Sequence, residues 1–251
     1  MHPQVNIVGI KGIPEVEPGD DLVDLIIQAT EAQGTPFQQG DVLVVTQKVV
    51  SKAEGRIIKL DDIKPSPTAL QFAHEHNKDP RHIEIILQES RHIIRMERGL
   101  IISETYHGFK CANAGIDMSN MPDTRTACLL PKDPDASARY IRVSIEKLHD
   151  IRVAVIISDS FGRPWREGIV NVAIGTSGLD PLRNLRKTKD AYGHPLQSTV
   201  VAVADELAAA AGMVMAKDSN IPVALIKGYA YNPKEQRASI LLRPHNQDLF
   251  L

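Results

Sequence analysis

Two short apolar runs constrain the fold of this chain more than any other feature. Val42-Leu43-Val44-Val45 follows a Gly40-Asp41 turn, and a second run extends from Val153 to Ile157. An apolar run without polar alternation is typical of a strand that is buried on both faces. The sequence therefore predicts a central sheet with a layer of structure on each side.

The rest of the chain mixes strand and helix signals. Further strands are predicted at Val5 to Ile10, Leu100 to Ser103, Asn171 to Ile174 and Pro222 to Gly228. Helices are predicted after Asp20-Asp21, from Asp79-Pro80 to near Gly99, from about Ala136 to Leu148 with Asp133 or Asp135 near its start, and from Asp205 toward Met215. Because apolar runs occur beside turn-bounded segments, we expect an α+β fold with a mixed sheet rather than a regular parallel one.

Length and charge exclude several classes of protein. The 251 residues suffice for a single domain over positions 1–251 that has two lobes, and the net charge of −2 gives no reason to expect nucleic acid or an anionic membrane as partner. No apolar stretch approaches a membrane span, and the N-terminus lacks a signal-peptide pattern. Two cysteines, Cys111 and Cys128, argue against a disulfide framework and against a paired-cysteine zinc site. We expect a cytoplasmic protein with small polar partners.

Two polar motifs carry the strongest chemical signal. They are Cys111-Ala-Asn-Ala-Gly-Ile-Asp117-Met-Ser-Asn120 and Ser158-Asp159-Ser160-Phe-Gly-Arg163-Pro-Trp165-Arg166. Each places a carboxylate where a strand is expected to end. Mg²⁺ often takes one or two protein carboxylates beside water and phosphate oxygens. Asp117 and Asp159, with the hydroxyl of Ser160, are therefore candidate ligands of a divalent cation; the other common role of an isolated loop aspartate is to cap a turn.

Phosphates near such a cation also require basic side chains. The candidates are Lys52 and Arg163, followed by Lys48, Arg166, Arg183 and Arg186, although any one such residue is more often an ordinary surface residue. Thr46, Gln47, Lys48, Ser51 and Lys52 are expected in a loop that follows the first buried strand. Trp165 either stacks on a ring system or packs between lobes. The chain has no Gly-x-x-x-x-Gly-Lys-Ser/Thr loop, no Gly-x-Gly-x-x-Gly and no Gly-x-Ser-x-Gly elbow.

The ordered motifs resemble those of the coenzyme F420:L-glutamate ligase family. The matching segments are Pro18-Gly-Asp-Asp-Leu22, Gly40 to Arg56, His107 to Asp117, Asp133-Pro-Asp-Ala-Ser137, Asp159 to Arg166, Tyr192 to Leu196 and Ala204-Asp-Glu206. They cover nearly the whole chain. The resemblance implies a two-lobed α+β ligase fold in an intertwined homodimer. Some members carry an added C-terminal flavin-binding domain, which we do not expect in these 251 residues.

The resemblance also implies an activity and a set of site residues. A member of this family adds L-glutamate to the coenzyme F420 precursor, extends the chain through γ-linkages, and consumes GTP by way of an acyl phosphate. It uses two Mg²⁺ or Mn²⁺ ions, with K⁺ as a further activator. Asp117 and Asp159 correspond to ligands of one metal ion, and Ser160 corresponds to a ligand of the second. The positions that correspond to nucleotide contacts are Ile13, Pro14, Glu15, Val16, Gln47, Lys52, Asn120, Met215, Ala216, Lys217, Asp218, Ser219 and Asn220.

One segment departs from the family pattern. Lys217 stands where the family has a metal-contacting glutamine, and a protonated lysine cannot be a metal ligand. Asp218 is the carboxylate that a shifted loop would offer instead. Two other interpretations follow: a related ligase that joins an amino acid to a different acid, and a nucleotide-binding regulatory protein without turnover.

Overall fold

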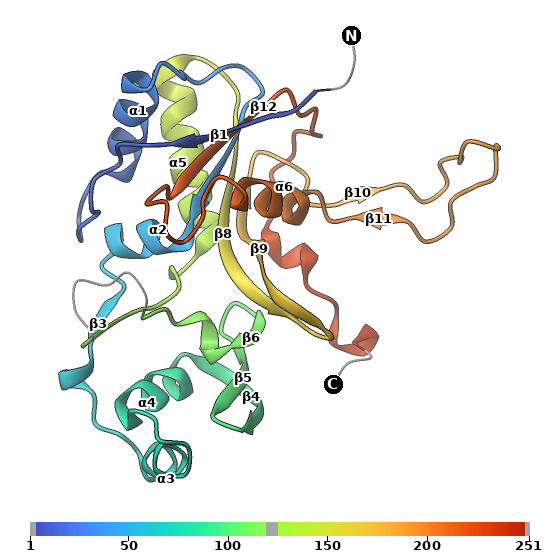
Figure 1. The fold of residues 1–251 in the computed structure, drawn as a ribbon. Helices are drawn as coiled ribbons and strands as arrows, with labels where there is room; N and C mark the ends of the chain where they lie inside the picture. Colours follow the sequence, from blue (N-terminus) through green and yellow to red (C-terminus); the bar gives the residue numbers. More distant parts are fainter. Residues whose placement is uncertain (1–3, 119–124, 249–251) are drawn as a thin grey trace.

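A computed structural model describes residues 4–118 and 125–248 of the chain, which form an α+β fold around a mixed five-stranded sheet (Figure 1). The strands are β1 (Asn6–Ile10), β12 (Val223–Lys227), β2 (Val42–Thr46), β8 (Ala154–Arg163) and β9 (Arg166–Ser177), in that spatial order. Only β2 and β8 run parallel, while the other neighbours are antiparallel. The predicted mixed sheet is confirmed.

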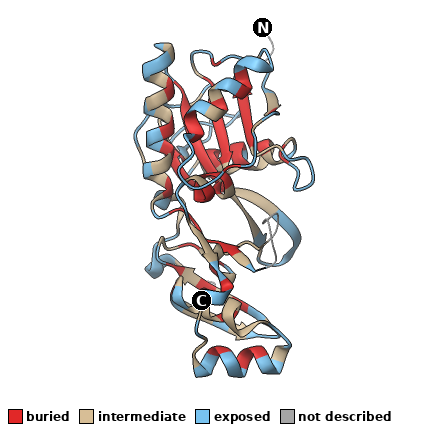
Figure 2. Cartoon of the chain, turned by 90° about the vertical axis from the view of Figure 1, so that its left-hand side faces the viewer, coloured by how far each residue is buried: buried red, intermediate tan, exposed pale blue. Residues whose placement is uncertain are grey.

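Helices cover both faces of this sheet. Helices α1 (Leu22–Ala32) and α5 (Pro134–His149) pack on the face that carries Leu43, Val45, Val155 and Ile157, and helix α6 (Val203–Gly212) packs on the opposite face. Successive strand side chains point to opposite faces, so an uninterrupted apolar run fills both layers. Figure 2 shows these strands buried between the helices. The two apolar runs therefore lie where the sequence predicted.

Residues 57–118 and 125–129 form a small lobe below the sheet of the large lobe (Figure 1). Its elements are β3 (Ile57–Lys59), α3 (Pro67–His76), α4 (Pro80–Gln88), β4 (Ser90–Glu97), β5 (Leu100–Thr105), β6 (Lys110–Ala112) and β7 (Thr126–Cys128). The lobe has its own apolar clusters, one around Phe72, Ile86 and Ile101 and one around Leu60 and Leu129. The chain enters and leaves at neighbouring points, because Leu129 N donates to Arg56 O over 2.9 Å.

Two sequence predictions about helices were wrong. The helix that begins after Asp79 ends at Gln88 rather than near Gly99, and residues 90–97 form strand β4. Arg98 and Gly99 both have positive φ, 52° and 74°, which makes them the tight turn of a β4–β5 hairpin instead of a helix end. Helix α2 (Gln47–Ala53) begins directly after β2, so four of the polar residues expected in a loop lie on a helix, and the fifth, Thr46, is the last residue of β2.

The β8–β9 hairpin is longer than the sequence indicated. Asp159 was expected just past the end of its strand, but β8 continues to Arg163 beyond the edge of its partner β2. The register shifts between Ile157, which pairs with Gly175, and Ser158, which pairs with Ala173, so Ile174 forms a bulge. Bulges bend a hairpin and change the direction of its side chains. The outer half of the hairpin consequently leans over the small lobe (Figure 1).

An arm projects from the large lobe between β9 and α6 (Figure 1). It is built on two short paired strands, β10 (Arg183–Asn184) and β11 (Val200–Val201), and Tyr192 near its tip is 88% exposed. The apolar side chains of the arm therefore contribute little to the core of their own chain. Among the described residues, no helix has the length and apolar character needed to cross a membrane.

Candidate functional site

A cavity of about 510 Å³ opens where strands β2 and β8 leave the sheet, and both lobes line it. Thr46 and Ser158, which pair across the two parallel strands, form its floor. The small lobe contributes Cys111, Ile116 and Asp117. The carboxyl ends of parallel strands are a frequent place for ligands, because the backbone there diverges into loops and helices.

The structure brings Asp117 and Asp159 to this one cavity. Asp117 is fixed by a two-way backbone pairing with Cys128, in which Asp117 N donates over 3.0 Å and Asp117 O accepts over 2.8 Å. The preceding turn includes Gly115 at φ +69°, where an added Cβ would lie 2.9 Å from the side chain of Leu130. A larger residue would therefore displace the segment that carries Asp117.

Asp159 lies in an environment that disfavours its charge. The pKa of its carboxyl group is raised from 3.8 to about 7, chiefly by burial; the hydrogen bond from Ser160 N lowers this pKa and the neighbouring charge of Asp117 raises it. Two carboxylates that repel each other in a partly desolvated cavity favour a cation between them. The ammonium group of Lys48 lies 2.7 Å from Oδ2 of Asp117 and supplies a positive charge near both carboxylates.

The hydroxyl of Ser160 faces the same cavity from the next position of β8. Its backbone N–H donates to Oδ1 of Asp159 over 2.8 Å, and its Oγ donates to Oδ1 of Asn171 over 2.8 Å. Since the hydroxyl proton is used in the second bond, the lone pairs of the oxygen remain for another partner.

These oxygens suit a hard divalent cation. Two carboxylates and one hydroxyl are too few to enclose Mg²⁺, but they match a site that water and phosphate oxygens complete. Within residues 4–118 and 125–248, no group of three or more His, Cys, Asp or Glu side chains could hold a metal ion by itself. The donor set therefore fits a cation that binds together with a phosphorylated ligand rather than a fully protein-bound metal.

Another part of the cavity wall is built from the turn after β1 and the first turns of α2. Ile13, Pro14, Glu15 and Val16 line it, as do Gln47 and Lys52. Gln47 is 2% exposed and accepts a hydrogen bond of 2.9 Å from Ser51 Oγ. Lys52 is 4% exposed and its ammonium group pairs with Glu15. A nearly buried lysine at the rim of a cavity is well placed to meet an anion.

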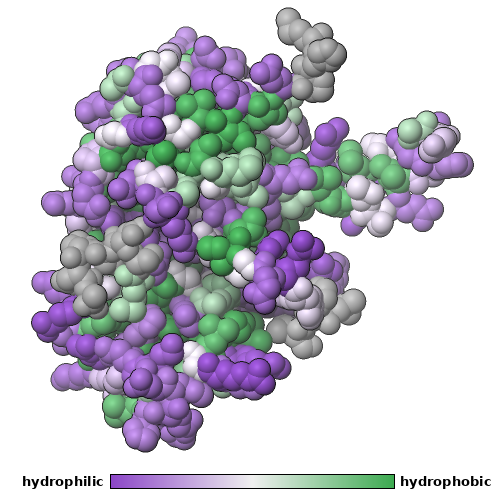
Figure 3. All heavy atoms as spheres, viewed as in Figure 1, coloured by the Kyte–Doolittle hydropathy of each residue, from purple (hydrophilic) through white to green (hydrophobic). Residues whose placement is uncertain are grey.

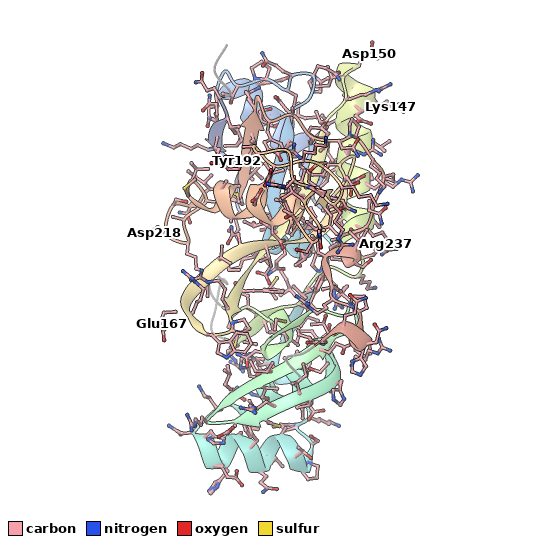
Figure 4. All side chains as sticks on the ribbon, turned by 90° about the vertical axis from the view of Figure 1, so that its right-hand side faces the viewer. Lys147, Asp150, Glu167, Tyr192, Asp218 and Arg237 are labelled. Atoms are coloured by element: carbon pink, nitrogen blue, oxygen red, sulfur yellow. The ribbon has the colours of Figure 1, made fainter. Side chains whose placement is uncertain are left out.

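The segment between α6 and β12 contributes only some of the expected residues. Met215, Ala216, Lys217 and Asn220 line the cavity, and the positive charge of Lys217 lowers the pKa of Asp159. Asp218 and Ser219 are absent from that lining, and Figure 4 shows Asp218 at the outside of the molecule. Asn120 falls outside the described residues.

Other candidates lie elsewhere. Trp165 is 80% exposed at the tip of the β8–β9 hairpin, and Arg163 donates to the backbone there. Figure 4 shows the neighbouring Glu167 at the outer edge of this hairpin. Arg183 lies on the arm in β10, and Arg186 follows it. None of these residues lines the cavity. Cys111 does, but burial raises the pKa of its thiol to about 12, so it stays protonated.

Asn171 is the residue that the sequence analysis missed. It lines the cavity and lies directly opposite Ser160 in the hairpin. Counting back from the turn at Pro164-Trp165 would have placed Ile169 there, because Arg163 pairs with Arg166. A second irregularity near the tip shifts the register, and Gly168, at φ +84° in β9, is a sequence signal that could have marked it. Asn171 itself, the polar first residue of a predicted strand, was a further hint.

Comparison with known proteins agrees with the motifs. Residues 9–228 match the family model described as F420-0:Gamma-glutamyl ligase. A protein of Methanothermobacter thermautotrophicus named coenzyme F420:L-glutamate ligase is 47% identical over 98% of both chains. Proteins with the same name from Methanopyrus kandleri and Methanocaldococcus jannaschii are 43% and 41% identical, over 94% and 98% of this chain and 93% and 97% of their own lengths.

Proposed function

The chain belongs to the F420-0:gamma-glutamyl ligase family, and from that premise we propose that it joins L-glutamate to a coenzyme F420 precursor at the expense of GTP. The observation that carries the proposal is the cavity between the lobes. It gathers two carboxylates, a hydroxyl and the nearly buried Lys52 in one space. That arrangement suits a nucleotide whose phosphates extend toward a divalent cation.

The proposed reaction has two steps, because a carboxylate is a poor electrophile. In the first step, a carboxylate oxygen of the acceptor attacks the γ-phosphorus of GTP, the bond to the β-phosphate breaks, and GDP leaves. In the second step, the amine of glutamate attacks the carbonyl carbon of the acyl phosphate. The carbon–oxygen bond to phosphate breaks, inorganic phosphate leaves, and the amine loses a proton. Repetition at the γ-carboxylate of the added glutamate gives a γ-linked chain.

Catalysis of such a transfer consists mainly of positioning and charge neutralisation. We assign the binding of the nucleotide to Ile13 to Val16, Gln47 and Lys52. Asp117, Asp159 and Ser160 would hold Mg²⁺ or Mn²⁺, which supplies neutralisation of the phosphoryl oxygens when bound. Lys48 and Lys217 add positive charge near Asp159, since both lower the pKa of its carboxyl group.

Lys217 favours one alternative, a related ligase with a different acid acceptor. Its charge reaches Asp159, at the end of the cavity where the acceptor carboxylate must meet the γ-phosphate. A fixed ammonium group in place of a metal ligand changes the charge that the acceptor must match. The two functions share their fold and chemistry, so only the identity of the product separates them.

We also propose that the protein is a homodimer in which the arm contacts a second copy. Figure 3 shows hydrophobic residues gathered over the large lobe and continuing along the base of the arm. An arm that buries little against its own chain is explained if a partner covers it. Burial of its apolar side chains would then offset the entropy of ordering it.

The decisive test mixes purified protein with GTP, Mg²⁺, L-glutamate and the precursor without glutamate. We expect product masses that increase by whole glutamate residues and one phosphate released for each addition. Asp159→Asn is the matched control, since it removes one negative charge from the cavity but keeps its volume. Folded wild-type protein that releases no phosphate and adds no glutamate would refute the proposal. Addition to another acid, but not to this precursor, would support the alternative acceptor. Calorimetric titration with GTP and with ATP tests the nucleotide.

A further inference from the structure

We propose that Asn171 is a positioning residue, which holds the hydroxyl of Ser160 so that its oxygen faces the cavity as a cation ligand. The inference rests on the metal role proposed for Ser160. It assigns a function to a residue on β9 that neither the motifs nor the chemistry of the two carboxylates requires.

The first support is the direction of the hydrogen bond. Ser160 Oγ donates to Oδ1 of Asn171 over 2.8 Å, and the two residues pair directly across the β8–β9 hairpin. A serine hydroxyl has one proton and rotates freely unless a partner fixes it. With its proton committed to Asn171, the hydroxyl presents only lone pairs to the cavity. A metal ion requires this orientation, because a proton that pointed at the cation would repel it.

The second support is the packing that holds the amide of Asn171 itself. Gly212, the last residue of α6, lies so close that an added Cβ would be 3.0 Å from Nδ2 and 3.2 Å from Cγ of Asn171. Near its first residue, the same helix is joined to β9 by a hydrogen bond in which Ala173 N donates to Oδ1 of Asp205 over 2.9 Å. Asp205 thus holds β9 beside the bulge at Ile174, and Gly212 packs against the side-chain amide of Asn171. The orientation of Ser160 is therefore supported from α6, on the far side of the hairpin.

The two carboxylates at the cavity explain why a neutral amide, rather than a third carboxylate, accepts the hydroxyl proton of Ser160. Asp117 and Asp159 already place two carboxylates at the cavity. An amide oxygen accepts the serine proton without adding a third negative charge to the metal-free protein. A carboxylate at position 171 would accept the same proton, and its charge would be favourable only when a cation is bound.

The test measures Mn²⁺ binding rather than activity. Electron paramagnetic resonance of free Mn²⁺ gives the Kd in the presence of GDP, so no turnover occurs. Ser160→Ala and Asn171→Leu should each raise the Kd by about tenfold, the usual effect of losing a ligand or the group that orients it. Asn171→Asp should restore binding at least to the wild-type Kd. Glu167→Leu, on the exposed tip of the same strand, is the matched control and should leave the Kd unchanged.

A double variant that combines Ser160→Ala with Asn171→Leu shows whether Asn171 acts on the cation through Ser160 or directly. If Asn171 acts through Ser160, Asn171→Leu should add nothing to the Kd of Ser160→Ala. An additional tenfold loss in the double variant, or a wild-type Kd for Asn171→Leu, would overturn the inference and leave the metal role of Ser160 standing. A wild-type Kd for Ser160→Ala would overturn both.

A second variant covers the case in which Asn171→Leu does not fold. Gly212→Ala changes neither partner of the hydrogen bond but presses a methyl group on the amide of Asn171. It should raise the Kd for Mn²⁺ in the wild-type background and not in the Ser160→Ala background. An unchanged Kd in both backgrounds would count against the positioning role. Circular dichroism confirms that each variant is folded before titration.

Discussion

The ammonium group of Lys48 and the carboxylate of Asp117 form an ion pair of 2.7 Å that joins the two lobes across the cavity. Lys48 lies on α2 of the large lobe and Asp117 on the segment of the small lobe that precedes β7. Their side chains are only 18% and 26% exposed, so water screens the pair weakly. The metal-free protein thus has a cation of its own beside the two carboxylates.

Removal of Lys48 should destabilise the metal-free protein. Lys48→Met removes the cation that pairs with Asp117 beside Asp159, and we expect the free energy of unfolding in EDTA to fall by about 1–3 kcal/mol. Added Mg²⁺ should recover part of that loss, because it replaces the missing charge. Urea denaturation with and without Mg²⁺ measures both effects.

Arg95→Met provides the control for Lys48→Met. Arg95 is 73% exposed at its side chain and lies 3.9 Å from Glu97, so its removal should change the free energy of unfolding by less than about 0.5 kcal/mol. Equal stability of Lys48→Met and wild type in EDTA would show that the interlobe ion pair contributes nothing.

Asp159→Asn should separate stability from activity. We expect turnover to fall on the order of 100-fold or more, because the cavity loses a charged oxygen. The metal-free variant should nevertheless be more stable than wild type at pH 8. Burial raises the pKa of Asp159 from 3.8 to about 7 in the folded state. The cost of ionising it in the folded state therefore begins as the pH rises above 3.8 and is complete above about 7.

The stability difference between Asp159→Asn and wild type should depend on pH, because the folded state raises the pKa of Asp159. The stability advantage of Asp159→Asn over wild type should grow between pH 5 and pH 8, and Mg²⁺ should reduce it. Urea denaturation in EDTA at both pH values measures the difference. An advantage that shrinks with rising pH would mean that the folded protein stabilises the charged carboxylate instead.

Gly175→Ala should be strongly destabilising. Gly175 lies in β9 against the start of α5, and an added Cβ would lie 2.4 Å from both the carbonyl carbon and the oxygen of Pro134. Because backbone cannot move aside like a flexible side chain, we expect a loss of about 2 kcal/mol or more in the free energy of unfolding. Gly162→Ala, in the same hairpin with no atom within 4 Å of the added methyl, should cost much less. Similar thermal midpoints for both variants would contradict the close packing.

Replacement of the arm should change the assembly without unfolding the lobes. A variant in which a short Gly-Ser loop replaces residues 185–198 loses an exposed segment but none of the two central cores. We expect light scattering to give the mass of two chains for wild type and of one chain for this variant, with near-native circular dichroism. A dimeric variant would place the contact elsewhere.

Features fixed by neighbouring residues could be predicted from the sequence. The helix starts at Asp21 and Asp79 were found and Asp133 was one of two candidates for a third, because each aspartate side chain accepts a backbone N–H within its own first turn. The strand at residues 90–97 was not found. Ile93 and Ile94 continue the helical spacing of Ile86, and the positive φ of Gly99 suits a helix end and a hairpin turn equally well.

In the candidate site, too, the residues within short motifs were predicted and their tertiary contacts were not. Asp117, Asp159 and Ser160 were identified because short motifs contain them, and the structure brings all three to one cavity. Their partners depend on strand register, which two irregularities in the β8–β9 hairpin shift. The contacts of Asn171 with Ser160 and of Lys48 with Asp117 arise from tertiary placement, so no local pattern could indicate them.

The adjacency of Arg56 and Leu129, where the small lobe begins and ends, makes that lobe an insertion whose length is free to vary. Because both ends are held at one hydrogen bond, a longer or different insert leaves the sheet of the large lobe undisturbed. Yet the insert carries Asp117 and one wall of the cavity. A change in the insert can therefore alter one wall of the cavity while the wall built on β1, β2 and α2 stays in place.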